Sequence, residues 1–170
     1  MIELRDCTLF RGLDERTAAA IAQVFVRARF EPGEVLFHEG SDGNALVVVL
    51  EGLLELTQRG SSGEIHLADV QPGRVLGLTS LVDPGPRTAS LRALDEGEVA
   101  VLDRATFHTL WKAQGDAAAK LHLQLARVAV EDLRSADRKL AELLEEPVQP
   151  RLSGEAAEIW PSLAHRALSS

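Results

Sequence analysis

Residues 45–57 read ALVVVLEGLLELT, two apolar runs separated by Glu51 and Gly52. Runs of Val and Leu of this length favour β-strands, and glycine reaches positive φ without steric cost where a strand reverses. The stretch therefore predicts two antiparallel strands that turn at Gly52.

Six further runs rich in Val, Leu and Ile flank this pair: FVRARF (25–30), EVLFHEG (34–40), EIHLADV (64–70), RVLG (74–77), TASLRAL (88–94) and EVAVLD (98–103). We expect strand reversals at the glycines between or within them, namely Gly33, Gly40, Gly43, Gly52, Gly73 and Gly77. Many short strands at this spacing predict a mainly β fold with added α-helices, a jelly-roll-like antiparallel β-roll of about eight strands.

Helical patterns stand at both ends of this region. Asp14 is placed to cap a short helix over residues 15–24, because its carboxylate can accept from free N–H groups of the first turn. Asp103 is placed to cap a second helical pattern, which bends at Gly115 and continues to about residue 146. Pro147 and Pro150 end it.

The long C-terminal helix carries two apolar stripes. Leu121, Leu125 and Val128 form the stripe that we expect to pack on the roll. The other stripe repeats every seven residues, the spacing of a coiled-coil seam, and comprises Ala126, Ala129, Leu133, Ala136, Leu140 and Leu143. A helix with two apolar faces needs two partners, which favours a homodimer through residues 118–146; the alternative is that this stripe packs on its own domain.

These patterns predict a roll with its N-terminal helix over residues 1–117, a dimerisation helix over 118–146 and a tail over 147–170. The tail has a short amphipathic piece around Ile159, Trp160 and Leu163. It is either loosely ordered or a docking segment, for the roll or for an unknown protein partner. Roughly 24 residues follow the helix, fewer than the roughly 60 that a winged helix-turn-helix module needs, so we expect no DNA-binding module.

The composition excludes several function classes. A net charge of -8 and a pI of about 5.1 argue against a nucleic-acid partner. There is no apolar run of the roughly 18 residues that a membrane span requires, and we expect a cytoplasmic protein with no membrane partner. The single cysteine, Cys7, cannot form an internal disulfide, which agrees with a reducing compartment.

Neither a metal site nor an active site is indicated. The five histidines are scattered, without paired ligand spacing and without a cysteine nearby. No nucleophile lies in a motif that would activate it. We therefore expect no metal, no catalytic residues and no enzyme.

The order of these parts resembles the cyclic-nucleotide-binding domain family, in particular its bacterial cyclic-AMP receptor and FNR branch. The resemblance runs from about Leu9 to Leu143. It is carried by EPGEVLFHEGSDG (31–43), by ALVVVLEGLLELT, and by VQPGRVLGLTSLVDPGPRTASLRAL (70–94), which resembles the family's phosphate-binding cassette. It implies an eight-stranded β-roll with a short N-terminal helix and a long C-terminal helix, often used for dimerisation.

The resemblance also implies a ligand site. Arg87 matches the arginine that binds the cyclic phosphate and Thr88 its hydroxyl-bearing neighbour, while Gly77, Leu78, Thr79 and Ser80 match the start of the short helix whose N–H groups face that phosphate. A guanidinium suits phosphate because it can donate two parallel hydrogen bonds. Asp132 matches a position that contacts the base. The implied ligand is cyclic AMP or another cyclic nucleotide, with no required cofactor.

The sequence departs from the family pattern in two places, at Leu78 and at the pair Asp132 and Leu133. Leu78 stands where ligand-binding members have a glutamate that accepts from the ribose 2′-OH, and that loss is worth about 1.5–3 kcal/mol, or roughly ten- to hundredfold in affinity. Asp132 and Leu133 stand where the bacterial receptor has a Thr-Ser pair. Two hypotheses follow: a non-enzymatic sensor that binds a phosphorylated ligand at Arg87 and signals through the C-terminal helix, or a degenerate, ligand-free homodimeric scaffold for protein interaction.

Overall fold

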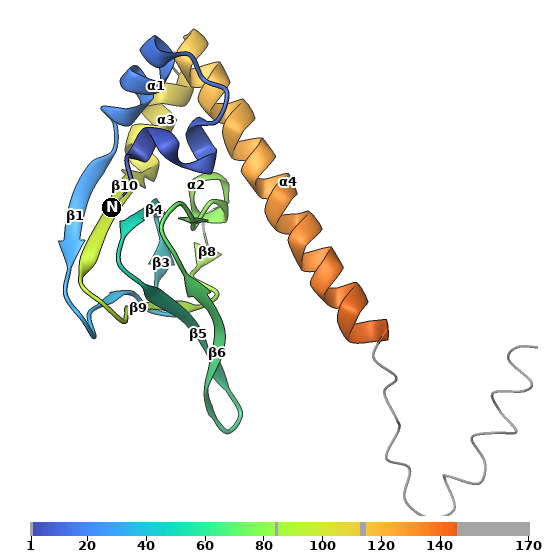
Figure 1. Ribbon diagram of the computed structural model, residues 1–170. Helices are drawn as coiled ribbons and strands as arrows, with labels where there is room; N and C mark the ends of the chain where they lie inside the picture. The colour runs from blue at the N-terminus through green and yellow to red at the C-terminus, as the bar shows by residue number, and fades with distance from the viewer. Residues whose placement is uncertain (1, 84, 113–114, 146–170) are drawn as a thin grey trace, which may run out of the picture. The chain divides into compact units, whose positions relative to one another are not determined.

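The computed structural model describes residues 2–83, 85–112 and 115–145 (Figure 1). The predicted tail over 147–170, with Trp160 and the two prolines that precede it, lies outside these residues. The chain divides into two compact units, 1–132 and 133–170. The fold below is that of the first unit.

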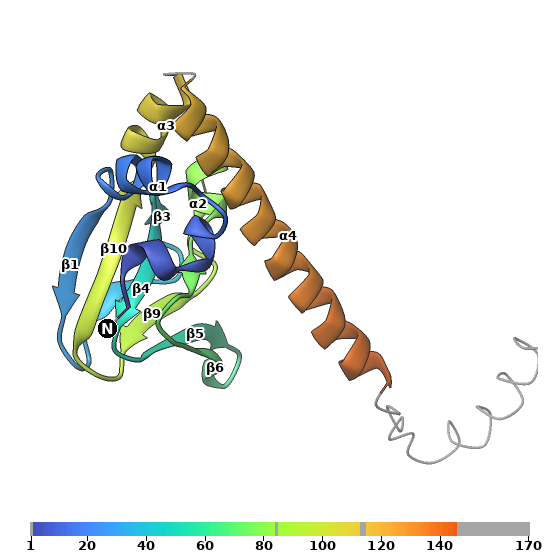
Figure 2. The ribbon, with the colours of Figure 1, turned by 45° about the horizontal axis from the view of Figure 1, so that its top comes forward.

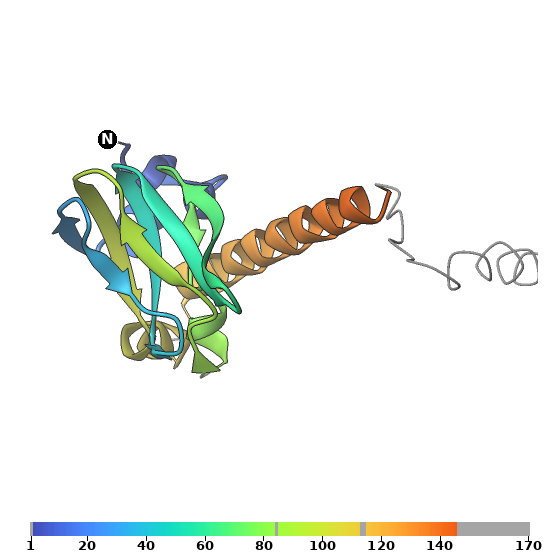
Figure 3. The same ribbon diagram turned by 90° about the horizontal axis from the view of Figure 1, so that it is seen from below.

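Ten strands build an antiparallel roll (Figures 1 and 3). One sheet has the order β1-β10-β4-β7, the second has the order β2-β9-β5-β6, and β3 pairs with β8. The strands are β1 (Val26–Phe30), β2 (Val35–Phe37), β3 (Asp42–Gly43), β4 (Ala45–Glu51), β5 (Leu54–Gly60), β6 (Gly63–Val70), β7 (Val75–Leu76), β8 (Gly85–Pro86), β9 (Ser90–Ala93) and β10 (Gly97–Asp103). All eight predicted runs contain strands, and the predicted β-roll is confirmed.

The short pair β3–β8 was not anticipated, and it corrects one glycine. We expected Gly43 to lie at a strand reversal, and this prediction is wrong. Gly43 is buried within β3 and pairs with Gly85. The other five predicted glycines all have positive φ. At Gly43 a side chain is excluded by close packing rather than by backbone conformation, since a Cβ there would overlap Ser80 Oγ.

The helices begin where the predicted caps lie. Helix α1 (Glu15–Ala22) begins after Asp14, whose carboxylate accepts from Thr17 N at 2.9 Å. Helix α3 (Arg104–Lys112) begins after Asp103, which accepts from Thr106 N at 2.9 Å. Helix α4 (Asp116–Glu145) follows, and two 3-10 turns, η1 (Leu4–Asp6) and η2 (Thr8–Phe10), precede α1. Figure 2 shows α1 and α3 together at one end of the roll.

Strand β4 is buried on both faces, because it separates two apolar clusters. Its residues Leu46, Val48 and Leu50 belong to a cluster that also includes side chains from α1, α3, α4 and the short helix α2 (Thr79–Val82). Val47 and Val49 belong to a second cluster, which joins residues of the two four-stranded sheets. A continuous apolar run is what a strand buried on both faces requires.

The stripe predicted to pack on the roll is confirmed. Leu121, Leu125 and Val128 of α4 are 0%, 4% and 6% exposed and belong to the first cluster. Burying each such side chain stabilises the fold by roughly 1.5–3 kcal/mol. The expected boundary at residues 117 and 118 remains a prediction, although the compact unit extends to Asp132.

Neither a membrane-spanning helix nor a metal-binding cluster occurs in the described part of the chain. None of its helices has the length and hydropathy needed to cross a bilayer. In the same residues, no three His, Cys, Asp or Glu side chains lie close enough together to hold a metal ion.

Candidate functional site

The candidate site is built around the short helix α2 (Thr79–Val82), which follows Gly77. Gly77 has a φ of 73°, and a Cβ there would overlap Arg87 Nη1 and lie 2.7 Å from the Ala45 carbonyl oxygen. Gly43 is equally restricted by Ser80 on α2. Two glycines therefore allow α2 to lie close to strands β3 and β4.

Arg87 is the central side chain of this site. It is 8% exposed, and its Nη1 donates to Ser80 Oγ at 3.2 Å while its Nη2 donates to the Ala45 carbonyl oxygen at 2.9 Å. The Phe37 ring lies beneath the guanidinium, with its centroid 4.3 Å from Cζ. The guanidinium Nε is buried and has no hydrogen-bond partner in the part of the chain that the structure describes.

Within the described ranges, no carboxylate forms an ion pair with Arg87. Its pKa is lowered from the ordinary arginine value, first by burial and then by the like charge of Arg104. An arginine nevertheless remains protonated at neutral pH. The site therefore holds a buried positive charge whose compensation inside the protein comes from neutral oxygens and an aromatic ring.

Arg104, the first residue of α3, is a contact that the sequence analysis missed. Its Nε donates to the Ser80 carbonyl oxygen at 2.6 Å, and its Nη2 donates to the carbonyl oxygens of Ser80 and Gly43. Two arginines thus hold Ser80, Arg87 through the hydroxyl and Arg104 through the backbone. The only sequence signal was a basic residue directly after the Asp103 cap, which does not identify a partner 24 positions earlier.

A cavity of about 190 Å³, the α2 cavity, lies beside this arrangement. Its apolar wall includes Phe37, Leu56 and Leu76, from strands β2, β5 and β7. Its polar wall is formed by Gly77, Thr79, Ser80, Arg87 and Thr88. A lining that combines a guanidinium and hydroxyl-bearing residues with apolar side chains suits a small anion with an apolar body.

Five of the seven predicted ligand residues, Gly77, Thr79, Ser80, Arg87 and Thr88, are thus brought together, and two lie elsewhere. Leu78 lines neither this cavity nor any other cavity described here, because its side chain packs against the first apolar cluster. Asp132 also lines none of the cavities described here, and its carboxylate lies 3.8 Å from Arg74 Nη2. Contact of these two residues with a ligand therefore remains a prediction without geometric support.

The predicted seam on α4 is solvent-exposed in this single chain. Ala126, Ala129, Leu133, Ala136 and Leu140 are all exposed, Leu133 and Leu140 by 62% and 56%. The side chain of Leu143 lies outside the described part of the structure. Three apolar residues of the same helix that are not part of the predicted seam, Leu123, Val130 and Leu144, are also exposed. This degree of apolar exposure on one helix is typical of a surface that contacts another molecule.

Comparison with known proteins identifies what the chain is similar to. Residues 27–114 match the family described as the Cyclic nucleotide-binding domain. The chain is 27% identical over 152 residues to the CRP-like cAMP-activated global transcriptional regulator of Mycobacterium tuberculosis, a match that covers 89% of this chain and 66% of that protein. It therefore spans slightly less than two thirds of that regulator.

A solved structure and a second type of relative extend this comparison. The Thermus thermophilus Catabolite Activator Protein superposes with a TM-score of 0.71 at 31% identity, covering 80% of this chain and 62% of that one. The Acetyltransferase Pat of Mycolicibacterium smegmatis is 25% identical over 113 residues, which cover 66% of this chain and 34% of the enzyme. The relatives described here thus include a regulator and an enzyme, each longer than the region that is shared.

Proposed function

Because the chain belongs to the cyclic nucleotide-binding domain family, we propose that it is a non-catalytic regulatory module that binds a cyclic nucleotide or another small phosphorylated ligand at Arg87. Occupancy of this site is passed on through the C-terminal helix. Cyclic AMP is the first candidate ligand, since the Mycobacterium regulator described above is named as cAMP-activated.

The observation that supports this proposal is the uncompensated charge of Arg87. A guanidinium has five N–H donors, and hydrogen bonds to Ser80 and Ala45 account for two of them. The remaining donors match the geometry of a phosphate, which guanidinium binds through two parallel charge-assisted hydrogen bonds. Thr79 and Thr88, which both carry hydroxyl groups, line the same cavity.

The size of the α2 cavity indicates that ligand entry requires a movement. Its volume of about 190 Å³ is below the roughly 300–1,000 Å³ of common ligand pockets. We therefore infer that Arg87 and α2 shift when a nucleotide enters. Arg104 bonds the Ser80 carbonyl oxygen from the first turn of α3, so a shift of α2 would pull on α3, which precedes α4 in the chain. A ligand drives this change only if it binds the shifted state more tightly.

Thermal unfolding with cyclic AMP, cyclic GMP and cyclic di-GMP tests the proposal. A ligand at a hundred times its Kd should add about 2.7 kcal/mol to the free energy of unfolding. Arg87→Gln should abolish the shift. Arg59→Gln is the matched control, because Arg59 is an exposed arginine on β5 outside the α2 cavity, and it should leave the shift unchanged.

We also propose that α4 pairs with α4 of a second copy of the chain. The support is the exposed stripe containing Leu133 and Leu140, with its alternating steps of three and four residues. Such spacing keeps one apolar seam facing a partner helix. The small alanines of the stripe would allow the two backbones to approach closely.

The second candidate function is a ligand-free homodimeric scaffold. It is favoured by Leu78, whose side chain is part of the apolar packing where a ligand-contacting glutamate is expected. Arg87 would then serve to hold α2 against β4. The two candidates are distinguished by the same titration: no shift with any of the three nucleotides at millimolar concentration leaves only the scaffold.

A further inference from the structure

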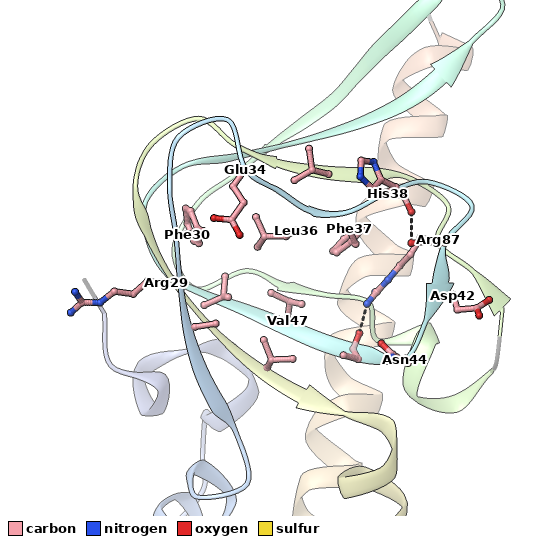
Figure 4. Close-up of a pocket in the computed structure, with 16 residues that line it drawn as sticks. Arg29, Phe30, Glu34, Leu36, Phe37, His38, Asp42, Asn44, Val47 and Arg87 are labelled. Atoms are coloured by element: carbon pink, nitrogen blue, oxygen red, sulfur yellow. Dashed lines mark hydrogen bonds between the residues drawn. The ribbon is translucent and has the colours of Figure 1, made fainter.

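A second cavity, the seam cavity, is lined in part by β1 of one sheet and β2 of the other. Each of these strands pairs only with an inner strand in the described sheets, β1 with β10 and β2 with β9, so no backbone ladder closes the roll at this edge. The cavity has a volume of about 510 Å³, within the roughly 300–1,000 Å³ of common ligand pockets. Figure 4 shows its lining.

Most of the lining is apolar. It includes Phe30, Leu36, Phe37, Val47, Val99 and Val101, contributed by strands of both sheets. The charged groups lie at the margins: Figure 4 shows Glu34 at one end, Arg87 at the other, and Arg29 pointing away from the cavity. A lining that is mostly apolar, with one buried cation at an end, suits a ligand that has an apolar body and an anionic head.

Arg87 is the feature that selects an anion. Arg87 is only 8% exposed, and its Nε has no hydrogen-bond partner among the described residues. An unsatisfied buried donor is costly, so a ligand oxygen that accepts from it is favoured. The carboxylate of Asp42, which also lines the cavity, points away from Arg87 in Figure 4 and forms no ion pair with it. Among the described residues, no carboxylate thus matches this charge.

We propose that the seam cavity binds a small amphiphilic anion of the straight-chain carboxylate class. The carboxylate lies at Arg87, and the hydrocarbon chain runs along Phe30, Val99 and Val101. This inference goes beyond nucleotide binding and does not require it. Because Arg87 and Phe37 line both cavities, a carboxylate in the seam cavity and a phosphate in the α2 cavity compete for one guanidinium.

The test is calorimetric titration of the native chain with hexanoate, octanoate and decanoate below their aggregation concentrations. Each additional buried CH₂ should raise affinity up to about fourfold, so that decanoate binds most tightly. Decyltrimethylammonium, which has the same chain and the opposite charge, should not bind. Equal binding of the cation and of decanoate would overturn the proposal, as would the absence of decanoate binding at millimolar concentration.

Two variants on β1 locate the binding. Ala28 is an exposed residue of the seam cavity, opposite Val99 in the strand register, so Ala28→Trp fills the cavity without enlarging a buried side chain. It should weaken decanoate binding at least tenfold. Val26→Trp is the control, since Val26 is 68% exposed on the same strand and lines no described cavity; it should bind as the native chain does.

The same variants separate this proposal from the nucleotide site. Ala28→Trp should retain any stabilisation by cyclic AMP, and decanoate should raise the apparent Kd of cyclic AMP for the native chain. Decanoate binding without any nucleotide response would reject the proposed function and keep this inference. Unchanged decanoate binding by a folded Ala28→Trp chain would place the ligand elsewhere and reject the inference.

Discussion

Replacing Gly77 with alanine tests how closely Arg87 is held in the site. A Cβ at Gly77 would overlap Arg87 Nη1 and lie 2.7 Å from the Ala45 carbonyl oxygen. Gly40 provides a matched control, because its φ of 80° is close to the 73° of Gly77 but a Cβ there would meet nothing within 4 Å. The two substitutions share a conformational cost and differ in the contact with Arg87 and Ala45.

The expected magnitudes follow from these surroundings. An alanine held in the left-handed region costs about 1–2 kcal/mol of unfolding free energy, which we expect for Gly40→Ala. Gly77→Ala adds overpacking, typically about 1–3 kcal/mol. The Ala45 oxygen belongs to the backbone of buried strand β4 and cannot turn aside as the end of a long side chain can. The expected loss for Gly77→Ala is therefore about 2–5 kcal/mol.

Urea unfolding followed by circular dichroism measures both losses. In a domain with about 5–15 kcal/mol of total stability, Gly77→Ala should lower the unfolding midpoint clearly more than Gly40→Ala. In an Arg87→Ala background the excess cost of Gly77→Ala should fall, because one of its two overlapping neighbours is gone. If Gly77→Ala costs no more than Gly40→Ala in the native chain, Arg87 is not packed against Gly77 and the described site is wrong.

Three further predictions concern other parts of the chain. Leu133→Asp with Leu140→Asp should give a monomer by light scattering, whereas an unchanged dimer mass would rule out pairing through the apolar stripe of α4. Burial lowers the pKa of His122 in the folded state. The unfolded state therefore binds more protons below the ordinary histidine pKa of about 6.5, and the free energy of unfolding should fall as the pH decreases through that value. His122→Phe should remove this part of the pH dependence of the urea midpoint between pH 7.5 and 5.5, and an unaltered pH dependence would contradict the prediction. Burial, and secondarily the charge of Asp6, raises the pKa of the Cys7 thiol to about 11. A thiol-specific reagent should therefore label the native chain only as it unfolds, and rapid labelling at neutral pH would show that Cys7 is accessible.

The elements with local causes were predictable from the sequence. The strands follow from short Val- and Leu-rich runs, and the helix starts follow from Asp14 and Asp103, each of which bonds a backbone N–H three residues later. The buried stripe of α4 follows from helical periodicity. Each of these features depends on residues only a few positions apart, so the pattern that produces it is visible in a short stretch of sequence.

The site itself could be predicted only in part. Family resemblance pointed to Arg87 and its neighbours, and the structure does bring five of the seven residues together. The resemblance could not show that Leu78 faces the apolar core, because one turn of a short helix has no periodicity from which to assign a face. Nor could it find Arg104, whose partner is a backbone carbonyl group on another element.

The sequence by itself determined the strands, their glycine turns, the capped helices and the presence of a candidate anion-binding arginine. Tertiary structure alone decided that Arg87 bonds the carbonyl group of Ala45, 42 residues away, that it stacks on Phe37, and that it lines two cavities. The physical reason is that these contacts depend on how distant strands pair and pack. A single sequence specifies which faces are apolar, whereas the partners of a buried polar group are selected only when those faces close on one another.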